Sequence, residues 1–271
     1  MEASDPRSHA GSDGPAAWSG AQVRESFNGI HSILHYTRAA HFLGLWRSER
    51  LMIERFLTDP AADVLEAGCG AGRVTLGLWE MGYRSIHAFD FADELVDQAR
   101  RLAREQGAGS IVFACADATT VGTPELGPAP AGGFGVALFM FNGLMQIPGR
   151  RNRRAALGRL HALCRDGATL IFTTHDRDVS GDDGSWWRDE AARWADGRQD
   201  LRLTDFGDRR FRDESGEVFI HIPDRQEILS DLSATGWRHG YDAMRGELAK
   251  EGPDVTSFSD NCRFWVASRC P

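Results

Sequence analysis

Residues 64–73 read Val-Leu-Glu-Ala-Gly-Cys-Gly-Ala-Gly-Arg, and this stretch indicates the fold more clearly than any other. The apolar residues at its start predict a short buried strand that ends in an acid, Glu66. Three glycines then alternate, at Gly68, Gly70 and Gly72, and the lack of a Cβ atom lets their backbone come close to a ligand. A helix that begins at residue 73 would present its free N–H groups at the same place. The stretch therefore predicts a strand, a ligand-binding glycine loop and a helix in succession.

The spacing of these glycines differs from that of two phosphate-binding loops. The dinucleotide fingerprint GxGxxG needs a third glycine where this chain has Arg73. A P-loop needs Gly-Lys-Ser/Thr after its glycines, and Lys250 is the only lysine in the chain. The single lysine also excludes the Tyr-xxx-Lys pair of epimerase-type and dehydrogenase-type Rossmann enzymes, which is the first alternative.

Strands and helices alternate on both sides of this loop. Further apolar runs with helical segments between them predict strands at residues 85–89, 111–114, 136–140 and 169–174. Such alternation predicts an α/β fold, a Rossmann-like seven-stranded, mostly parallel sheet with helices on both faces. Two last strands, near residues 237–243 and 263–267, are expected to complete the sheet.

The segments outside this core divide the chain further. Residues 1–20 have the composition of a disordered tail, and residues 21–271 are expected to form one domain. Helical periodicity over residues 21–58 predicts an N-terminal cap. Residues 184–222 are expected to form an inserted lid, with a Trp-rich helix at 185–195 and a hairpin of two extended segments, 201–206 and 218–222.

With the glycine loop in this position, the sequence resembles the class I S-adenosylmethionine-dependent methyltransferases over roughly residues 62–175. The first motif of that family is an acid followed by GxGxG. The resemblance implies S-adenosyl-L-methionine as the cofactor, with a carboxylate after the second strand on the ribose and one after the third strand near adenine. The cofactor-binding residues that it implies are Glu66, Gly68, Cys69, Gly70, Gly72, Asp90, Phe91, Asp117, Ala118, Phe139 and Met140.

Candidate catalytic residues are few. His175 follows the fifth strand at the edge where open α/β sheets bind ligands, and it could act as a base. Tyr36 lies on the N-terminal helices, which cover the cofactor in small-molecule members of the family. Asn142 follows the fourth strand, in a sequence without the Asn/Asp-Pro-Pro-aromatic motif of base methyltransferases. Trp186 and Trp187 could cover an apolar acceptor or simply pack the inserted helix, and His221 is a weaker candidate.

Composition limits the range of partners. The net charge of -8 disfavours a protein that grips phosphate backbones, and the arginines at 150, 151, 153 and 154 are expected to form a solvated helix start. Neither a metal site nor a disulfide framework is predicted from five cysteines without CxxC spacing, which fits a cytoplasmic protein. No segment is long and apolar enough to span a membrane.

The expected function is methyl transfer to an oxygen or nitrogen of a small molecule, such as a natural-product intermediate. The alternatives left open are an RNA methyltransferase and a catalytically silent, cofactor-binding regulatory protein. A homodimer is also left open.

Overall fold

The computed structural model describes residues 17–179, 184–213 and 216–270. Its main sheet confirms the expected seven-stranded, mostly parallel, Rossmann-like architecture. β9 pairs antiparallel with both of its neighbours, whereas the first five strands pair in parallel. The spatial order of the strands is β3 (Val112–Cys115), β2 (Ile86–Asp90), β1 (Val64–Ala67), β4 (Phe134–Phe139), β5 (Cys164–Thr174), β9 (Arg263–Arg269) and β8 (Trp237–Met244).

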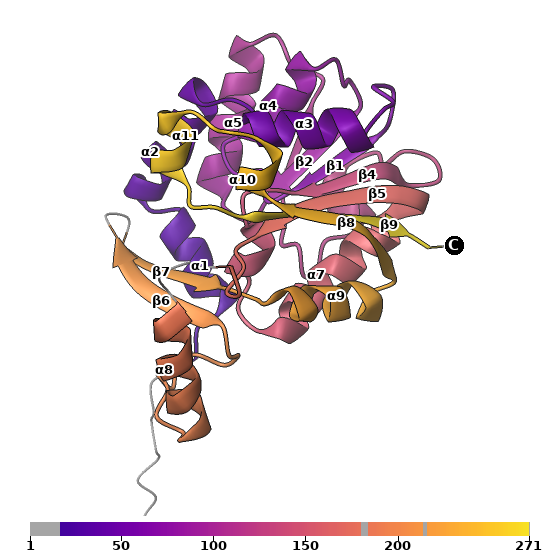
Figure 1. Ribbon diagram of the computed structural model, residues 1–271. Helices are drawn as coiled ribbons and strands as arrows, with labels where there is room; N and C mark the ends of the chain where they lie inside the picture. The colour runs from indigo at the N-terminus through magenta and orange to yellow at the C-terminus, as the bar shows by residue number, and fades with distance from the viewer. Residues whose placement is uncertain (1–16, 180–183, 214–215, 271) are drawn as a thin grey trace, which may run out of the picture.

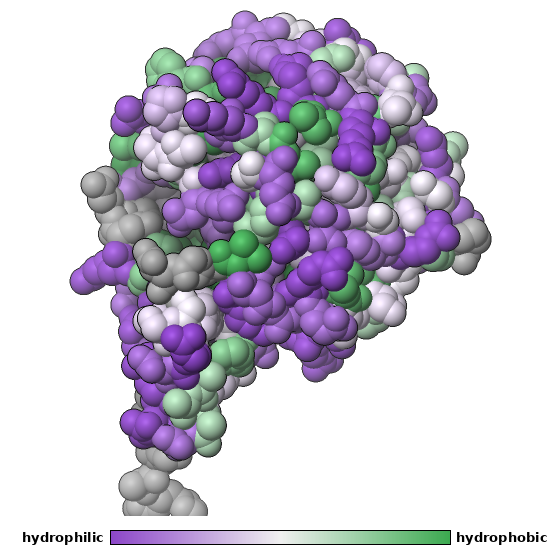
Figure 2. All heavy atoms as spheres, viewed as in Figure 1, coloured by the Kyte–Doolittle hydropathy of each residue, from purple (hydrophilic) through white to green (hydrophobic). Residues whose placement is uncertain are grey.

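Helices cover both faces of this sheet (Figure 1). One face carries α3 (Arg47–Phe56), α4 (Arg73–Glu80) and α5 (Asp93–Glu105), and the other carries α6 (Thr123–Leu126), α7 (Arg150–Leu163) and α9 (Arg225–Ala234). Each layer buries its own hydrophobic cluster against the strands. On the face seen in Figure 2, hydrophobic residues form small separate groups within a hydrophilic surface. No helix in the described ranges is both long and apolar enough to cross a lipid bilayer.

The N-terminal segment folds into α1 (Gly20–Phe27), α2 (Ile30–Phe42) and α3. Two of these helices, α1 and α2, lie together with α11 (Pro253–Phe258) at one end of the strands (Figure 1). Asp93, the first residue of α5, accepts hydrogen bonds from Asn28 at 2.8 Å and from Arg24 at 3.3 Å. A short 3₁₀ helix, η1 (Gly143–Gln146), and α10 (Arg245–Leu248) complete this end of the molecule.

The insertion after β5 contains α8 (Gly184–Ala195) and a separate hairpin of β6 (Asp208–Asp213) and β7 (Gly216–His221). The prediction that residues 201–206 form its first strand was wrong. Asp208 accepts hydrogen bonds from the N–H groups of Thr204 and Asp205, at 3.0 and 2.9 Å, and these curl the chain before the strand begins. α8 projects away from the sheet (Figure 1). Its tryptophans 187 and 194 pack edge-on against Phe206.

The hairpin contacts the N-terminal helix α1 directly. Ser26 donates a hydrogen bond to the carbonyl of Glu217 at 3.3 Å, and the ring of Trp18 lies 6.1 Å from that of Phe219. The N–H group of Trp18 also donates to the carbonyl of Arg202. The insertion therefore reaches the rest of the molecule through β7 and α1.

A buried ionic cluster joins the hairpin to the main domain. His221 is fully buried, with Nδ1 2.8 Å from Asp208 and Nε2 2.9 Å from Glu227. Arg153 is also buried and lies 3.0 Å from Asp205 and 3.5 Å from Glu227. Both ring nitrogens of His221 face carboxylates, so this side chain bridges Asp208 of the hairpin and Glu227 of α9. His221 is thus a structural residue at the base of the hairpin.

This cluster corrects the prediction of a solvated arginine-rich helix start. Arg150 and Arg154 lie 2.8 and 2.7 Å from the carboxylate of Asp231 on α9, and Arg153 belongs to the cluster above. Arg151 is exposed. Three of the four arginines therefore pair with acids of the same chain because α9 packs beside α7, which periodicity within one helix does not reveal.

Gly77 lets the N-terminal segment approach α4, and this contact gives a test of the packing. A Cβ atom at this position would lie 2.2 Å from Cγ of Leu45. Alanine in a helix is normally more stable than glycine by about 1 kcal/mol. We expect Gly77→Ala to lower the melting temperature instead, because the cap must shift. Gly158→Ala, in α7 with nothing within 4 Å of its Cβ, should raise it. A stabilised Gly77→Ala would contradict this packing.

Candidate functional site

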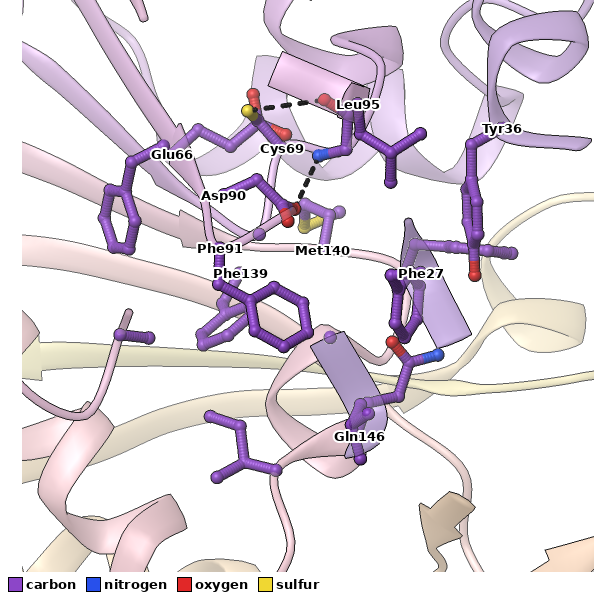
Figure 3. Close-up of a pocket in the computed structure, with 18 of the residues that line it drawn as sticks. Phe27, Tyr36, Glu66, Cys69, Asp90, Phe91, Leu95, Phe139, Met140 and Gln146 are labelled. Atoms are coloured by element: carbon purple, nitrogen blue, oxygen red, sulfur yellow. Dashed lines mark hydrogen bonds between the residues drawn. The ribbon is translucent and has the colours of Figure 1, made fainter. Parts of the chain in front are cut away.

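A cavity of about 270 Å³ opens at the carboxyl ends of β1, β2, β3 and β4. Most of its inner wall comes from the loops that follow these strands. All predicted cofactor-binding residues except Gly72 line it, namely Glu66, Gly68, Cys69, Gly70, Asp90, Phe91, Asp117, Ala118, Phe139 and Met140. Figure 3 shows Phe27 and Tyr36 on one side of the cavity and Asp90, Phe139 and Met140 on the other.

The glycine loop forms the floor of this cavity. Side chains at two of its positions would come too close to neighbouring residues. Gly68 has φ +64°, and a Cβ atom there would lie 2.7 Å from the ring of Phe139. Gly72 has φ +88°, caps the start of α4 and does not line the cavity. A Cβ atom there would lie 3.1 Å from the Cβ of Ala99 on α5. The first glycine therefore shapes the cavity, whereas the third lets two helices pack closely.

Asp90 ends β2 with both carboxylate oxygens directed at backbone. Its Oδ2 accepts a hydrogen bond from the N–H group of Gly70 at 2.8 Å, and Oδ1 accepts one from Ala92 at 2.9 Å. Although Asp90 stands at the end of a strand, the loops fold over it and leave it buried. Burial raises the pKa of this carboxyl, while the hydrogen bonds from Ala92 and Gly70 oppose the rise. Asp90 therefore ties the glycine loop to β2 from inside the cavity.

Asp117 follows β3 and is exposed at the cavity. Its Oδ1 accepts hydrogen bonds from both the N–H group and the hydroxyl of Thr119, each at 2.8 Å. These two bonds hold the carboxylate at the turn, as a helix-capping acid would be held. The two acids predicted from strand ends thus lie in one cavity, one buried and one exposed.

Glu66 is the most strongly perturbed acid of the cavity. It is buried at the end of β1, where it accepts a hydrogen bond from the hydroxyl of Thr75. Burial raises its pKa to about 8, although the Thr75 hydroxyl and the charge of Arg73 oppose the rise. Near neutral pH this side chain is therefore mainly protonated.

The pKa of Glu66 predicts how stability depends on pH. A carboxyl whose pKa is raised on folding adds stability below its unfolded value of about 4.5, and that stability is lost as the pH rises to about 8. We expect Glu66→Gln to remove this loss. The free energy of unfolding of the variant, relative to that of the wild type, should therefore be higher at pH 8 than at pH 5 by on the order of 3 kcal/mol. Denaturant unfolding at both pH values measures the gain, and an equal difference at both would contradict it.

The outer wall of the cavity is aromatic. Tyr36, the one predicted catalytic residue that lines the cavity, lies with its ring 5.5 Å from Phe27 and 6.0 Å from Phe141. Phe258, from α11 near the far end of the chain, stacks on Phe141 at 5.4 Å. The contributions of Phe27 and Phe258 were missed because no local pattern joins helices more than two hundred residues apart. This wall covers the cavity with rings from both ends of the sequence.

Arg73 was also missed as a site residue, although it directly follows the glycine loop. Its guanidinium binds both carboxylate oxygens of Glu49, at 2.6 and 2.7 Å, and donates to the carbonyl of Gly44 at 2.9 Å. It also lies 4.4 Å from the ring of Trp46. The buried pair fastens α3 and the preceding loop to the start of α4, so the cap and the glycine loop are held as one unit.

Asn142 and His175 contact one another outside the cavity lining. The Asn142 amide nitrogen lies 3.2 Å from Nε2 of His175, and its backbone N–H donates to the hydroxyl of Thr173. Burial lowers the pKa of His175, so this ring is neutral near pH 7. Phe141 and Asn142 both adopt positive φ, at 53° and 59°. This strained turn directs Phe141, rather than Asn142, into the cavity.

The tryptophans of α8 lie away from the cavity. The guanidinium of Arg209 lies over the ring of Trp186, which meets Trp187 edge-on, and neither tryptophan lines the cavity wall. The hypothesis that they cover the site has no support in this arrangement, whereas the N-terminal helices do cover it.

Comparisons with known proteins agree with this geometry. Residues 64–167 match the sequence model of a methyltransferase domain. None of the curated proteins is similar in sequence to this chain. The solved structures with a similar fold include an S-adenosylmethionine-dependent methyltransferase from Methanosarcina mazei, with 17% identity over 84% of this chain and 99% of that one and a TM-score of 0.63.

Two further structures match almost the whole chain. One is the 1,6-didemethyltoxoflavin N1-methyltransferase of Burkholderia thailandensis, crystallised with 1,6-didemethyltoxoflavin and S-adenosylhomocysteine (17% identity, 96% of this chain, 93% of that one, TM-score 0.59). The other is the [4+2]-cyclase SpnF (17% identity, 95% of this chain, 99% of that one, TM-score 0.60). Residues 64–167 therefore match the methyltransferase-domain model, and the chain has the fold of the class I S-adenosylmethionine-dependent methyltransferases.

Proposed function

We propose that this protein binds S-adenosylmethionine in the cavity and transfers its methyl group to an oxygen or nitrogen of a small-molecule acceptor. The observation that carries the proposal is the cavity itself. Its floor is a glycine loop in which a Cβ atom at Gly68 would lie 2.7 Å from the Phe139 ring, its inner wall holds Asp90 and Asp117, and its outer wall is aromatic. These residues fit a ligand with a sugar, a base and a short chain that carries an amine.

Each part of the cavity suits one part of that cofactor. A carboxylate has about four lone-pair sites, so Asp90 can accept ribose hydroxyls while it keeps its bonds to Gly70 and Ala92. Asp117 is placed to accept from the amine of adenine, and Phe91 offers an apolar face beside it. Glu66 lies at the other end of the floor, where a cationic amine would favour its ionised form.

When bound, S-adenosylmethionine supplies a methyl group on a positively charged sulfur. The chain's own residues then orient the acceptor and exclude water, which is much of what a displacement requires. The rings of Phe27, Tyr36 and Phe258 close the open side of the cavity. Tyr36 also brings a hydroxyl to this wall and can orient a polar acceptor group. His175 lies outside the lining, so we assign it no proton transfer.

An RNA acceptor is the less favoured alternative. The arginine-rich start of α7 is neutralised by Asp231, Asp205 and Glu227, and the chain carries a net charge of -8. Phosphate binding depends on cations that are free to replace counterions. A silent cofactor-binding role is a second alternative, and the likeness to a cyclase means that the fold alone does not specify the reaction.

Calorimetry followed by an activity screen tests the proposal. S-adenosylmethionine and S-adenosylhomocysteine should each bind with one-to-one stoichiometry, while NAD should not bind. Release of S-adenosylhomocysteine should then depend on an acceptor from a panel of phenols, aromatic amines, carboxylic acids and RNA oligonucleotides. Preferential binding of NAD would overturn the cofactor assignment. Cofactor binding with turnover only on RNA would overturn the small-molecule assignment.

A further inference from the structure

A second, larger cavity of about 770 Å³ lies on the other side of the aromatic wall. It is bordered by α2, by α11 and by Val218 of the hairpin strand β7. The two cavities share Phe27, Tyr36 and Phe258 as lining residues. A molecule in the second cavity is therefore separated from the proposed cofactor site by side chains alone.

About half of the residues that line the second cavity are apolar, and rings border it at several points. Leu34 and Phe42 line it from α2 and are 54% and 81% exposed. Where α2 meets α11, His35 stacks on Phe258 with 4.4 Å between ring centroids and 13° between their planes. Flat surfaces of this kind suit a planar or aromatic molecule, because stacking adds to the burial of apolar area. Two large apolar side chains exposed at the edge of one cavity form a surface that a ligand can cover.

The charges around this cavity are few. Arg38 and Asp254 are its only Arg, Lys, Asp or Glu lining residues, and no ion pair or hydrogen bond joins the Arg38 side chain to the part of the chain that the structure describes. His31 and His35 lie on the same helix as Arg38, at spacings of four and three residues that place all three on one side of it. On this side Arg38 is a cation without a paired carboxylate, which favours a neutral or singly anionic molecule and disfavours a polycation.

We propose that the second cavity is the acceptor site, and that it takes a planar, largely apolar small molecule with at most one anionic group, held near Arg38. This inference rests on the proposed function. The acceptor binds between α2 and α11 and extends past Phe27 and Tyr36 toward the cofactor cavity. The volume of the site is within the range of about 300–1,000 Å³ that small-molecule sites occupy. A nucleic acid does not fit this description, because the lining offers a single arginine.

A fluorescent probe of the same chemistry tests the site directly. The probe is 8-anilinonaphthalene-1-sulfonate, a largely apolar molecule with a planar naphthalene ring and one negative charge, titrated into the full chain saturated with S-adenosylhomocysteine. One probe should bind, and S-adenosylhomocysteine should not displace it. Leu34→Ser and Phe42→Ser should each weaken binding at least about fivefold. Both residues are largely exposed, so these variants should fold normally. Leu201→Ser, at a side chain that is 64% exposed and lines neither cavity, is the matched control.

A second probe isolates the charge. N-phenyl-1-naphthylamine has similar rings and no charge, so Arg38→Gln should weaken binding of the sulfonate several-fold and leave binding of the neutral amine unchanged. Equal binding of the sulfonate to all variants would overturn the site. A dimer that dissociates in Phe42→Ser would assign this face to a second copy and also overturn it. S-adenosylhomocysteine binding is measured separately on the same samples, so failure of the cofactor assignment is distinguishable from failure of the acceptor site.

Discussion

Replacing His221 by leucine should lower the free energy of unfolding by about 3–5 kcal/mol, the range seen when one partner of a buried ion pair is removed. The imidazole lies fully buried between Asp208 and Glu227, at 2.8 and 2.9 Å. Leucine fills similar space but leaves both carboxylates without their shared donor. Arg153 and Arg177 remain 3.5 Å from Glu227 and limit the loss.

Urea unfolding near pH 7 measures this effect, and His41→Leu is the control because His41 is exposed on α2. The control should change stability by less than about 0.5 kcal/mol. Burial opposes ionisation of Glu227, but the hydrogen bond from His221 and the charges of Arg153 and Arg150 lower its pKa to about 2. In the wild type, the ionised Glu227 therefore adds to the free energy of unfolding above about pH 4.5, and this addition is lost as the pH falls toward 2. Equal stability of His221→Leu and wild type near pH 7 would show that the cluster contributes nothing net.

Replacing Asp90 by alanine should reduce affinity for S-adenosylhomocysteine at least about tenfold. Two charge-assisted hydrogen bonds to ribose hydroxyls are worth roughly 1.5–3 kcal/mol each. The variant also leaves the N–H groups of Gly70 and Ala92 without their acceptor, which loosens the glycine loop. Unlike a purely ligand-contacting residue, Asp90 should therefore contribute to stability as well.

Calorimetry gives the affinity, and thermal unfolding without ligand gives the second effect. Asp97→Ala is the control, because Asp97 lies exposed on α5 and, within the described ranges, pairs with Arg100 alone, at 3.0 Å. Its affinity and melting temperature should match those of the wild type. An unchanged affinity in Asp90→Ala would mean that the ribose lies elsewhere, and an unchanged melting temperature would mean that the hydrogen bond to Gly70 does not hold the loop.

The sequence predicts which residues lie together in the inner half of the cavity, for a physical reason. Gly68, Asp90 and Asp117 each sit at the end of a strand, and parallel strands bring their carboxyl ends to one edge of the sheet. Local periodicity is then enough to place these residues together. The outer half depends on contacts between distant segments, such as Phe258 on Phe141 and Glu49 on Arg73, and no spacing rule within a segment predicts them.

The insertion shows the same limit. Its helix and hairpin are predictable, but the β-propensity of residues 201–206 gives way to a turn that the Asp208 side chain closes. The Trp-Trp pair suggested a cover for the site, and its rings instead pack within the insertion on Phe206 and Arg209. A pair of large aromatic residues in a sequence predicts that the rings are packed against other residues, but it does not predict which residues these are.

The contact between the hairpin and α1 separates two tasks of this chain. β7 touches α1 at Ser26 and lines the second cavity at Val218, while the glycine loop and both acids lie in a different part of the chain. Mutations at Val218 can therefore alter the cavity proposed to hold the acceptor without altering the groups proposed to bind the cofactor. A library for directed evolution of new acceptors belongs at Val218 and at exposed α2 positions such as Leu34 and Phe42, and the strand ends of the sheet and the His221 cluster should be left constant.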